Sequence, residues 1–129
     1  METINQEGTK KTPALHFDAE KGLIEIDGKS IPENSMFFYN PLLSWLNEYS
    51  EIAPPQTTVN IHLEYFNTTS SKCILDFFKT LDSIHNGSSK TEVTVNWLYE
   101  EDDEEMSRVG EDYKRLVNMP FKLVEVKEK

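Results

Sequence analysis

The segment from residue 57 to residue 99 constrains the fold of this chain most, because its apolar residues change their period twice. Over Thr57–Phe66 apolar and polar residues alternate, and this period of two predicts a β-strand. Immediately afterwards the spacing becomes helical, with apolar residues at Ile74, Phe77, Phe78, Leu81 and Ile84. Asn86-Gly87 ends this helix, and Thr91–Tyr99 forms the next strand. A strand, a helix and a strand in succession predict parallel strands joined by a right-handed crossover.

Further strands are predicted at both ends of the chain. Thr12–Phe17 and a return strand from Leu23 to Gly28 are expected to form a hairpin, because residues 18–22 have the composition of a turn. At the other end, Phe121–Val126 is expected to be the last strand.

Two more helices are predicted between these strands. Asn40 is expected to cap the first of them with Pro41 at its first position, where the missing N–H of proline costs nothing. Its apolar stripe consists of Leu42, Trp45, Leu46 and Tyr49. The other helix follows the acidic run at residues 100–105 and ends before Pro120. Its stripe consists of Met106, Val109, Tyr113, Leu116 and Val117.

The resulting order, β-β-α-β-α-β-α-β, predicts an α/β fold. We expect a mixed sheet with the helices packed mainly on one face, because helical crossovers give parallel neighbours and the hairpin adds an antiparallel part. Residues 1–11 have almost no apolar content and are expected to be a flexible N-terminal arm. Residues 12–129 contain no repeat and no linker, so we expect them to form a single domain.

Charge and cysteine content narrow the possible binding partners and the cellular compartment of the protein. The 13 basic against 23 acidic residues give a net charge of −10, which argues against binding to nucleic acid or to an anionic membrane. The N-terminus lacks the apolar stretch of a signal peptide, and the single cysteine excludes an internal disulfide. We therefore expect a protein of the reducing cytoplasm.

The sequence contains no group of residues with the spacing of a catalytic or metal site. His16, His62 and His85 are scattered, and there is neither a phosphate-binding glycine loop nor a nucleophile elbow. The acidic run Glu100–Glu105 lacks the alternating ligands and the glycine of a calcium loop. Its acids are expected to complement the dipole at the start of a helix. We therefore predict no enzymatic activity, no metal and no cofactor.

The turn between the strand Thr57–Phe66 and the helix after it carries four hydroxyl residues in a row. They are Thr68, Thr69, Ser70 and Ser71, and one hydroxyl is enough to cap a helix. A phosphate at this position would meet free backbone N–H groups and the positive end of the helix dipole. Capping and phosphorylation both remain open from these residues alone.

Several segments together resemble the SiaC family of bacterial regulatory phosphoproteins. They are Thr12-Pro13-Ala14, Pro32-Glu33-Asn34-Ser35, the stretch from Pro41 to Leu46, and Tyr65-Phe66-Asn67-Thr68 with the hydroxyls that follow. The resemblance implies a STAS-like fold of the anti-anti-sigma type and a protein that is not an enzyme. It also implies a Ser/Thr kinase and a PP2C-type phosphatase as partners. In its unphosphorylated form the protein would bind and activate a diguanylate cyclase, which links it to c-di-GMP, aggregation and biofilm formation.

The resemblance also assigns roles to single residues. The phosphoacceptor is the threonine directly after the asparagine, Thr68, and Asn67 is expected to hold the turn. Thr69 stands where the family often has a serine, so Thr69 and Ser70 stay open as additional acceptors, and Ser71 belongs to the same switch turn. The partner surface is expected to include the loop Pro32, Glu33, Asn34 and Ser35.

Two other functions stay open from the sequence. An anti-anti-sigma-like antagonist would use the same phosphorylation to control its binding to an anti-sigma kinase, without a cyclase. A small hydrolase or ligand-binding domain would use Glu33, His62 or the acidic run, and it would need a deep pocket with convergent titratable groups.

Overall fold

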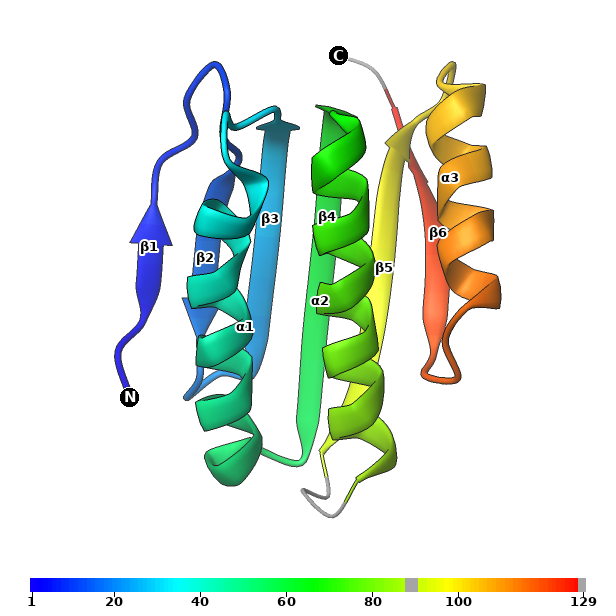
Figure 1. The fold of residues 1–129 in the computed structure, drawn as a ribbon. Helices are drawn as coiled ribbons and strands as arrows, with labels where there is room; N and C mark the ends of the chain where they lie inside the picture. Colours follow the sequence, from blue (N-terminus) through cyan, green and yellow to red (C-terminus); the bar gives the residue numbers. More distant parts are fainter. Residues whose placement is uncertain (88–90, 128–129) are drawn as a thin grey trace.

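The computed structural model describes residues 1–87 and 91–127, which form six strands and three helices (Figure 1). In chain order these elements are β1 (Ile4–Gln6), β2 (Ala14–Asp18), β3 (Leu23–Ser30), α1 (Ser35–Ile52), β4 (Gln56–Phe66), α2 (Thr68–Asn86), β5 (Glu92–Glu100), α3 (Glu104–Arg115) and β6 (Phe121–Val126).

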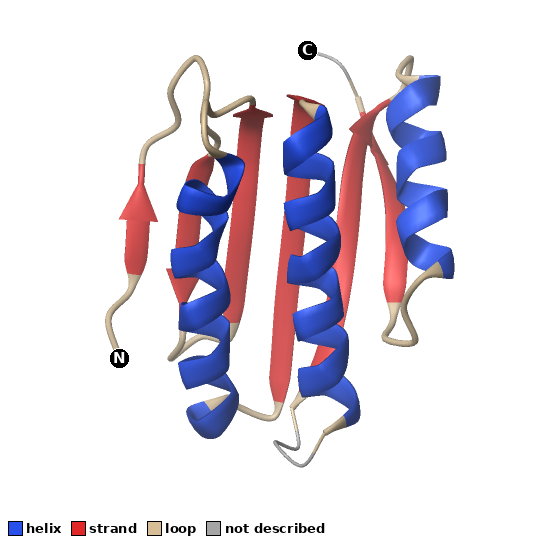
Figure 2. Ribbon diagram, in the orientation of Figure 1, coloured by secondary structure: helices blue, strands red, loops and turns tan. Residues whose placement is uncertain are grey.

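The strands form one sheet whose spatial order follows the chain, β1-β2-β3-β4-β5-β6. The first two pairings are antiparallel, whereas β3, β4, β5 and β6 run parallel to one another. Because each parallel strand lies one position further along the sheet, every right-handed crossover places its helix on the same face. All three helices do lie on that face (Figure 2). The predicted mixed sheet with helices on one face is confirmed.

The hydrophobic core lies between the sheet and this helix layer. Inward-facing strand residues such as Ile24, Val59 and Val95 have no exposed surface, and they alternate with partly exposed residues on the other face. Aromatic side chains connect the layers: the ring centroids of Phe17 and Trp45 lie 5.1 Å apart, and those of other buried rings form similar pairs. The helices therefore pack on the sheet through residues of their predicted apolar stripes, such as Trp45.

The start of α1 differs from the prediction. The helix begins at Ser35, and the side chain of Asn34 caps it by accepting a hydrogen bond from the backbone N–H of Phe37 at 3.0 Å. Pro41 consequently lies inside the helix rather than at its first position. The earlier start places Tyr39 in the core with 1% of its surface exposed, and this burial favours the longer helix although Pro41 cannot donate a hydrogen bond to the preceding turn.

Helix α2 begins directly after β4, as the sequence predicted, whereas α3 begins inside the acidic run, at Glu104, and ends early. Asn67 caps α2, and Asp103 caps α3 by accepting from the N–H of Met106 at 3.0 Å. Helix α3 ends at Arg115, so Leu116 is the residue after it and 55% of its surface is exposed. The prediction that Leu116 belongs to the buried stripe is wrong, because the helix ends at Arg115 and the helical spacing does not extend to Leu116.

The N-terminal arm includes a short strand that the sequence did not indicate. Ile4–Gln6 pair with β2, with Ile4 opposite Phe17, and the indole N–H of Trp45 donates to the carbonyl of Glu2 at 3.0 Å. Backbone hydrogen bonds to an edge strand need no particular side chain, so the polar composition of this segment does not prevent pairing. Residues 1–11 are therefore not a uniformly flexible arm.

The face of the sheet opposite the helices carries a row of polar side chains. Asn96 donates to the Oδ1 of Asn60 at 2.9 Å, and Asn60 donates to the Oε2 of Glu25 at 3.1 Å. These three residues lie in register on β5, β4 and β3, so the side-chain bonds run across the strands.

Over the two described ranges, none of the helices is both long and apolar enough to cross a membrane.

Candidate functional site

The hydroxyl turn lies at one end of the molecule, where all three helices begin. Each helix follows a parallel strand, and the carboxyl ends of these strands meet at the same edge of the sheet (Figure 1). The first turn of α2 therefore lies between the first turns of α1 and α3 (Figure 1). The unpaired backbone N–H groups of the three helices and their positive dipole ends gather at this edge.

Asn67 holds the turn and connects it to the loop before α1. Its Oδ1 accepts the backbone N–H of Ser70 at 2.9 Å and the hydroxyl of Thr69 at 3.2 Å. On the other side, its amide donates to the carbonyl of Pro32 at 3.4 Å, and its backbone N–H donates to the carbonyl of Ser30 at 3.0 Å. One residue thus satisfies the end of the helix and fixes the position of the neighbouring loop.

The four hydroxyls of the turn differ in their environments. Thr68 is exposed, and no group in residues 1–87 or 91–127 forms a hydrogen bond with its side-chain oxygen. Thr69 is exposed as a residue, but its oxygen is engaged by two other side chains. Ser70 has no exposed surface, and the hydroxyl of Ser71 donates to the carbonyl of Thr68 at 2.7 Å. Within the described residues, Thr68 is therefore the one of the four whose hydroxyl has no hydrogen-bond partner.

A chain of buried hydroxyls connects Thr69 to the core. The oxygen of Ser35 lies 2.7 Å from that of Thr69 and 3.2 Å from that of Ser70. Ser30 donates to Ser70 at 3.0 Å, and its oxygen lies 2.7 Å from the Oη of Tyr39. These contacts join β3, α1 and α2 at their shared edge.

The direction of this chain follows from the single hydrogen that each hydroxyl carries. Thr69 uses its hydrogen on Asn67, so Ser35 is the donor to Thr69. Ser30 uses its hydrogen on Ser70, so Tyr39 must donate to Ser30, which leaves Ser70 to donate to Ser35. Every hydroxyl in the chain then donates once, and the sequence of donors is Tyr39, Ser30, Ser70, Ser35 and Thr69.

The first donor of the chain stays protonated over the physiological range. Burial raises the pKa of Tyr39 to about 12, and the hydrogen bond with Ser30 offsets part of this effect. Because a tyrosinate could not donate, the raised pKa extends into the alkaline range the pH interval over which the chain keeps its direction.

The predicted loop Pro32–Ser35 lies against the hydroxyl turn. Ser35 belongs to the hydroxyl chain, the carbonyl of Pro32 accepts from Asn67, and Asn34 caps α1. Glu33 is exposed and lies 3.7 Å from the Nζ of Lys11. The structure thus brings together two segments that are separated by more than thirty residues in the sequence.

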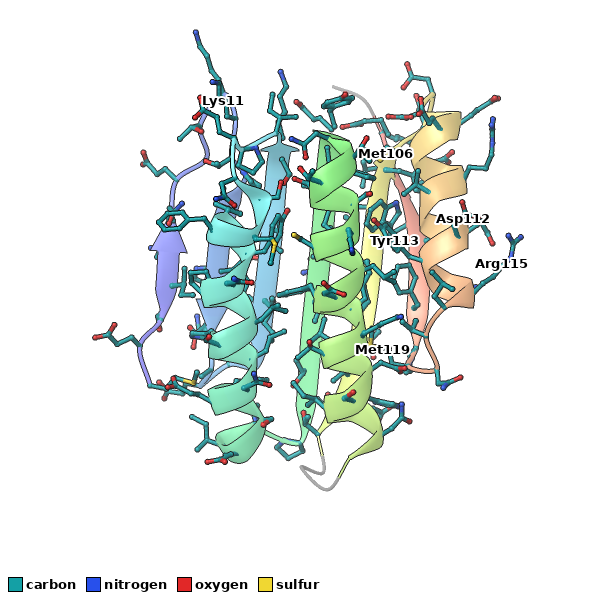
Figure 3. The ribbon with its side chains drawn as sticks, viewed as in Figure 1. Lys11, Met106, Asp112, Tyr113, Arg115 and Met119 are labelled. Carbon is teal, nitrogen blue, oxygen red and sulfur yellow. The ribbon has the colours of Figure 1, made fainter. Side chains whose placement is uncertain are left out.

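Helix α3 contacts the turn from the other side. The hydroxyl of Tyr113 donates to the carbonyl of Ser71 at 2.9 Å, and burial raises the pKa of this tyrosine. Tyr113 and Met106 lie between α3 and α2, whereas Asp112 and Arg115 lie on the outer side of α3 (Figure 3). A small pocket between the end of β4 and α3 is lined by the carboxylates of Glu64, Asp103 and Glu105 together with Tyr65, Phe66, Met106 and Val109.

Three large side chains near this edge are exposed, and the sequence analysis did not predict their exposure. Met36 and Phe37 follow Ser35 in the first turn of α1 and are 64% and 80% exposed, and Tyr65 at the end of β4 is 57% exposed. Phe37 also lines a largely apolar groove between α1 and the N-terminal arm. The signal that could have identified Met36 and Phe37 is an apolar pair outside the helical stripe, but it becomes visible only when the helix start is placed at Ser35.

Of the residues considered for enzymatic function, the structure brings His62 beside Glu100 of the acidic run but leaves Glu33 apart from both. His62 lies on the open face of the sheet, with its Nδ1 3.8 Å from Asp27 and its Nε2 3.3 Å from Glu100, whereas Glu33 lies on the loop before α1. The side chain of His85 accepts the N–H of Val93 at 3.0 Å. Cys73 is buried, and this burial raises the pKa of its thiol.

The acidic run divides between a strand end, a turn and a helix start. Glu100 ends β5, Asp103 caps α3, and Glu104 and Glu105 lie in its first turn, where their charge complements the helix dipole. Among the residues that the structure describes, no three His, Cys, Asp or Glu side chains are grouped so that they could hold a metal ion.

The fold and this edge define a class: a two-layer α/β protein with a mixed sheet, helices on one face and a hydroxyl-rich helix start. Residues 6–126 match the family model described as the SiaC family regulatory phosphoprotein. The chain therefore belongs to the SiaC family.

Solved structures and a curated protein support the same relationship. The structure of SiaC of Pseudomonas aeruginosa is 25% identical and superposes with a TM-score of 0.87, over 98% of this chain and all of that one. The structure of the diguanylate cyclase SiaD in complex with its activator SiaC, from the same organism, matches with a TM-score of 0.86, 25% identity and the same coverage. An uncharacterised protein of Pseudomonas aeruginosa (strain UCBPP-PA14) is 26% identical over 121 residues, 94% of each chain.

Proposed function

We propose that this protein is a non-enzymatic, cytoplasmic signalling protein whose unphosphorylated form binds and activates a diguanylate cyclase. The family is one of regulatory phosphoproteins, and a relative that matches almost the whole chain is an activator seen in complex with such a cyclase. The output of the protein would be c-di-GMP, with effects on aggregation and biofilm formation. The fold would be STAS-like, of the anti-anti-sigma type, which is supported by the single mixed sheet with all helices on one face.

Thr68 is the phosphoacceptor in this proposal. The observation that carries this assignment is the contrast within the turn: Thr68 is exposed and its hydroxyl has no partner in the part of the chain that the structure describes, while its three neighbours are hydrogen-bonded. A phosphate on Thr68 would meet the free N–H groups and the positive dipole of α2, an interaction worth about 0.3–2 kcal/mol. The domain can therefore accept the modification without unfolding.

A Ser/Thr kinase and a PP2C-type phosphatase would set the phosphorylation state. The chemistry supports a large effect on binding, because one phosphate adds a charge of about −1.5 to −2 and three acceptor oxygens. This charge would be added to a protein that already has a net charge of −10.

The partner surface would combine the loop Pro32–Ser35 with the exposed side chains beside it. Met36, Phe37 and Tyr65 offer apolar area at the same edge as Thr68, and such area supplies much of the binding energy in protein interfaces. A phosphate beside these side chains would have to be desolvated on binding, and a cost of about 1.4 kcal/mol already weakens affinity tenfold.

The proposal is tested by mapping the phosphate and by identifying the partner. The purified chain is incubated with extract of its native host, Mg²⁺ and ATP, and phosphopeptides are sequenced by mass spectrometry. Phosphate on Thr68 supports the assignment, and phosphate confined to residues outside 67–71 contradicts it. Affinity capture with the unphosphorylated chain should recover a diguanylate cyclase, whereas recovery of an anti-sigma factor would favour the antagonist function instead.

A further inference from the structure

The hydroxyl turn presents a kinase with a choice between adjacent acceptors. Thr68 and Thr69 have the same side chain, lie next to each other and are both exposed at the surface. Proximity to the helix dipole does not separate them, because both lie in the first turn of α2. Their hydrogen bonds do separate them, since Thr69 is engaged and Thr68 is free in the described part of the chain.

We propose that Ser35 is a specificity-determining residue, which withholds Thr69 from the kinase and thereby leaves Thr68 as the acceptor. The inference rests on the proposed function, in which Thr68 is phosphorylated. Ser35 acts through Thr69 and contacts neither ATP nor the transferred phosphate, so it is a positioning residue.

The chemistry of phosphoryl transfer explains why engagement matters. The acceptor oxygen forms a bond to the γ-phosphorus of ATP while the bond between that phosphorus and the β–γ bridging oxygen breaks and ADP leaves. The hydroxyl proton goes to a base of the kinase. Thr69 can react in this way only after two hydrogen bonds of its hydroxyl are broken. They are the bond accepted from Ser35, with an O–O distance of 2.7 Å, and the bond donated to the Oδ1 of Asn67, with an O–O distance of 3.2 Å.

Of the two hydrogen-bond partners of Thr69, Ser35 holds its hydroxyl more firmly. It is 4% exposed and comes from another element, 34 residues from Thr69, so the fold fixes its position and water has little access to replace it. Ser35 also accepts from Ser70, which holds the donor in one orientation. Asn67 alone would hold Thr69 by a longer bond within the same turn.

The test compares variants of the full chain that lack the preferred acceptor. Thr68→Ala is incubated with native-host extract, Mg²⁺ and γ-labelled ATP, and label on Thr69 is quantified by phosphopeptide mapping. We expect little label on this variant, and we expect Thr68→Ala with Ser35→Ala to gain label on Thr69 by about fivefold, the equivalent of one lost hydrogen bond.

Two matched controls separate positioning from loss of structure. Ser30→Ala breaks the same hydroxyl chain between Tyr39 and Ser70 but leaves the Ser35–Thr69 bond in place. Ser44→Ala removes an exposed hydroxyl from the same helix. In the Thr68→Ala background neither control should gain label on Thr69. Circular dichroism checks folding, and if Ser35→Ala is unfolded, the nearly isosteric Ser35→Cys takes its place with its weak S–H donor.

Three results would overturn the inference. They are a folded double variant without new label on Thr69, an equal gain of label with Ser30→Ala, and full labelling of Thr69 in Thr68→Ala alone. Each of these results is compatible with phosphate on Thr68 of the unaltered chain. A failure of the proposed function is distinct, because the unaltered chain itself would then carry its phosphate outside the turn.

Discussion

The phenolic oxygen of Tyr113 lies 2.9 Å from the carbonyl oxygen of Ser71, so α3 is hydrogen-bonded to the first turn of α2. On the other side of that turn, Ser35 of α1 is hydrogen-bonded to Thr69. The start of α2 is therefore held from both sides, although the hydroxyl of Thr68 between these contacts has no partner among residues 1–87 and 91–127. This arrangement gives a rigid support for a modifiable side chain.

Tyr113→Phe should destabilise the domain modestly. The substitution keeps the aromatic packing against Trp97 and Phe78 but removes the donor to Ser71, which costs about 0.5–1.5 kcal/mol in the free energy of unfolding. Urea denaturation measures the change. Tyr65→Phe is the control, because Tyr65 is 57% exposed, and equal losses in the two variants would argue against the role of the Tyr113 bond.

Asn67→Ala and Asn67→Asp should differ in stability. Alanine removes the cap of α2 and should cost about 1 kcal/mol, whereas aspartate keeps an acceptor for the N–H of Ser70 and loses the donor to Pro32. Thermal unfolding of the two variants should therefore place aspartate closer to the unaltered chain. The reverse order would mean that the amide contact with Pro32, and not the cap, is the main contribution of Asn67.

Tyr39 should make the protein sensitive to alkaline pH. Its pKa is raised from 10.0 to about 12 on folding, so between these values the unfolded chain has lost the proton that the folded chain retains. Stability is therefore unaffected by this group below about pH 10 and falls as the pH rises towards 12, by about 2–3 kcal/mol in total. Urea denaturation at several pH values should show a shallower alkaline loss for Tyr39→Phe. An unchanged slope would exclude Tyr39 as its source.

Much of the fold follows from local patterns in the sequence. The period-two strand β4 and the helix α2 were predictable, because each depends on residues adjacent in the chain, whereas the sequence offered the hydroxyls and not Asn67 as the cap of α2. The start of α1 was not predictable, since Asn34-Ser35 and Asn40-Pro41 both have the pattern of a helix start. Burial of Tyr39 decides between them, and burial depends on the whole fold.

The candidate site was predictable in location but not in its internal contacts. The run of hydroxyls and its strand-to-helix position could be found from the sequence, and the Pro32–Ser35 loop came from the family resemblance. The bond between Ser35 and Thr69 joins residues 34 positions apart, and the pairing of Ile4 with Phe17 depends on backbone groups. Both are set by the packing of elements and leave no periodic signal in the chain.

The central claim is that phosphate on Thr68 controls binding to a diguanylate cyclase. The measurement is titration calorimetry of the captured cyclase with the unphosphorylated chain and with the chain phosphorylated at Thr68, with Thr68→Ala carried through the kinase reaction as the control. We predict that the unphosphorylated chain and Thr68→Ala bind with similar affinity and that phosphorylation weakens binding at least about tenfold, or 1.4 kcal/mol. Equal affinity of the phosphorylated and unphosphorylated chains would contradict the account.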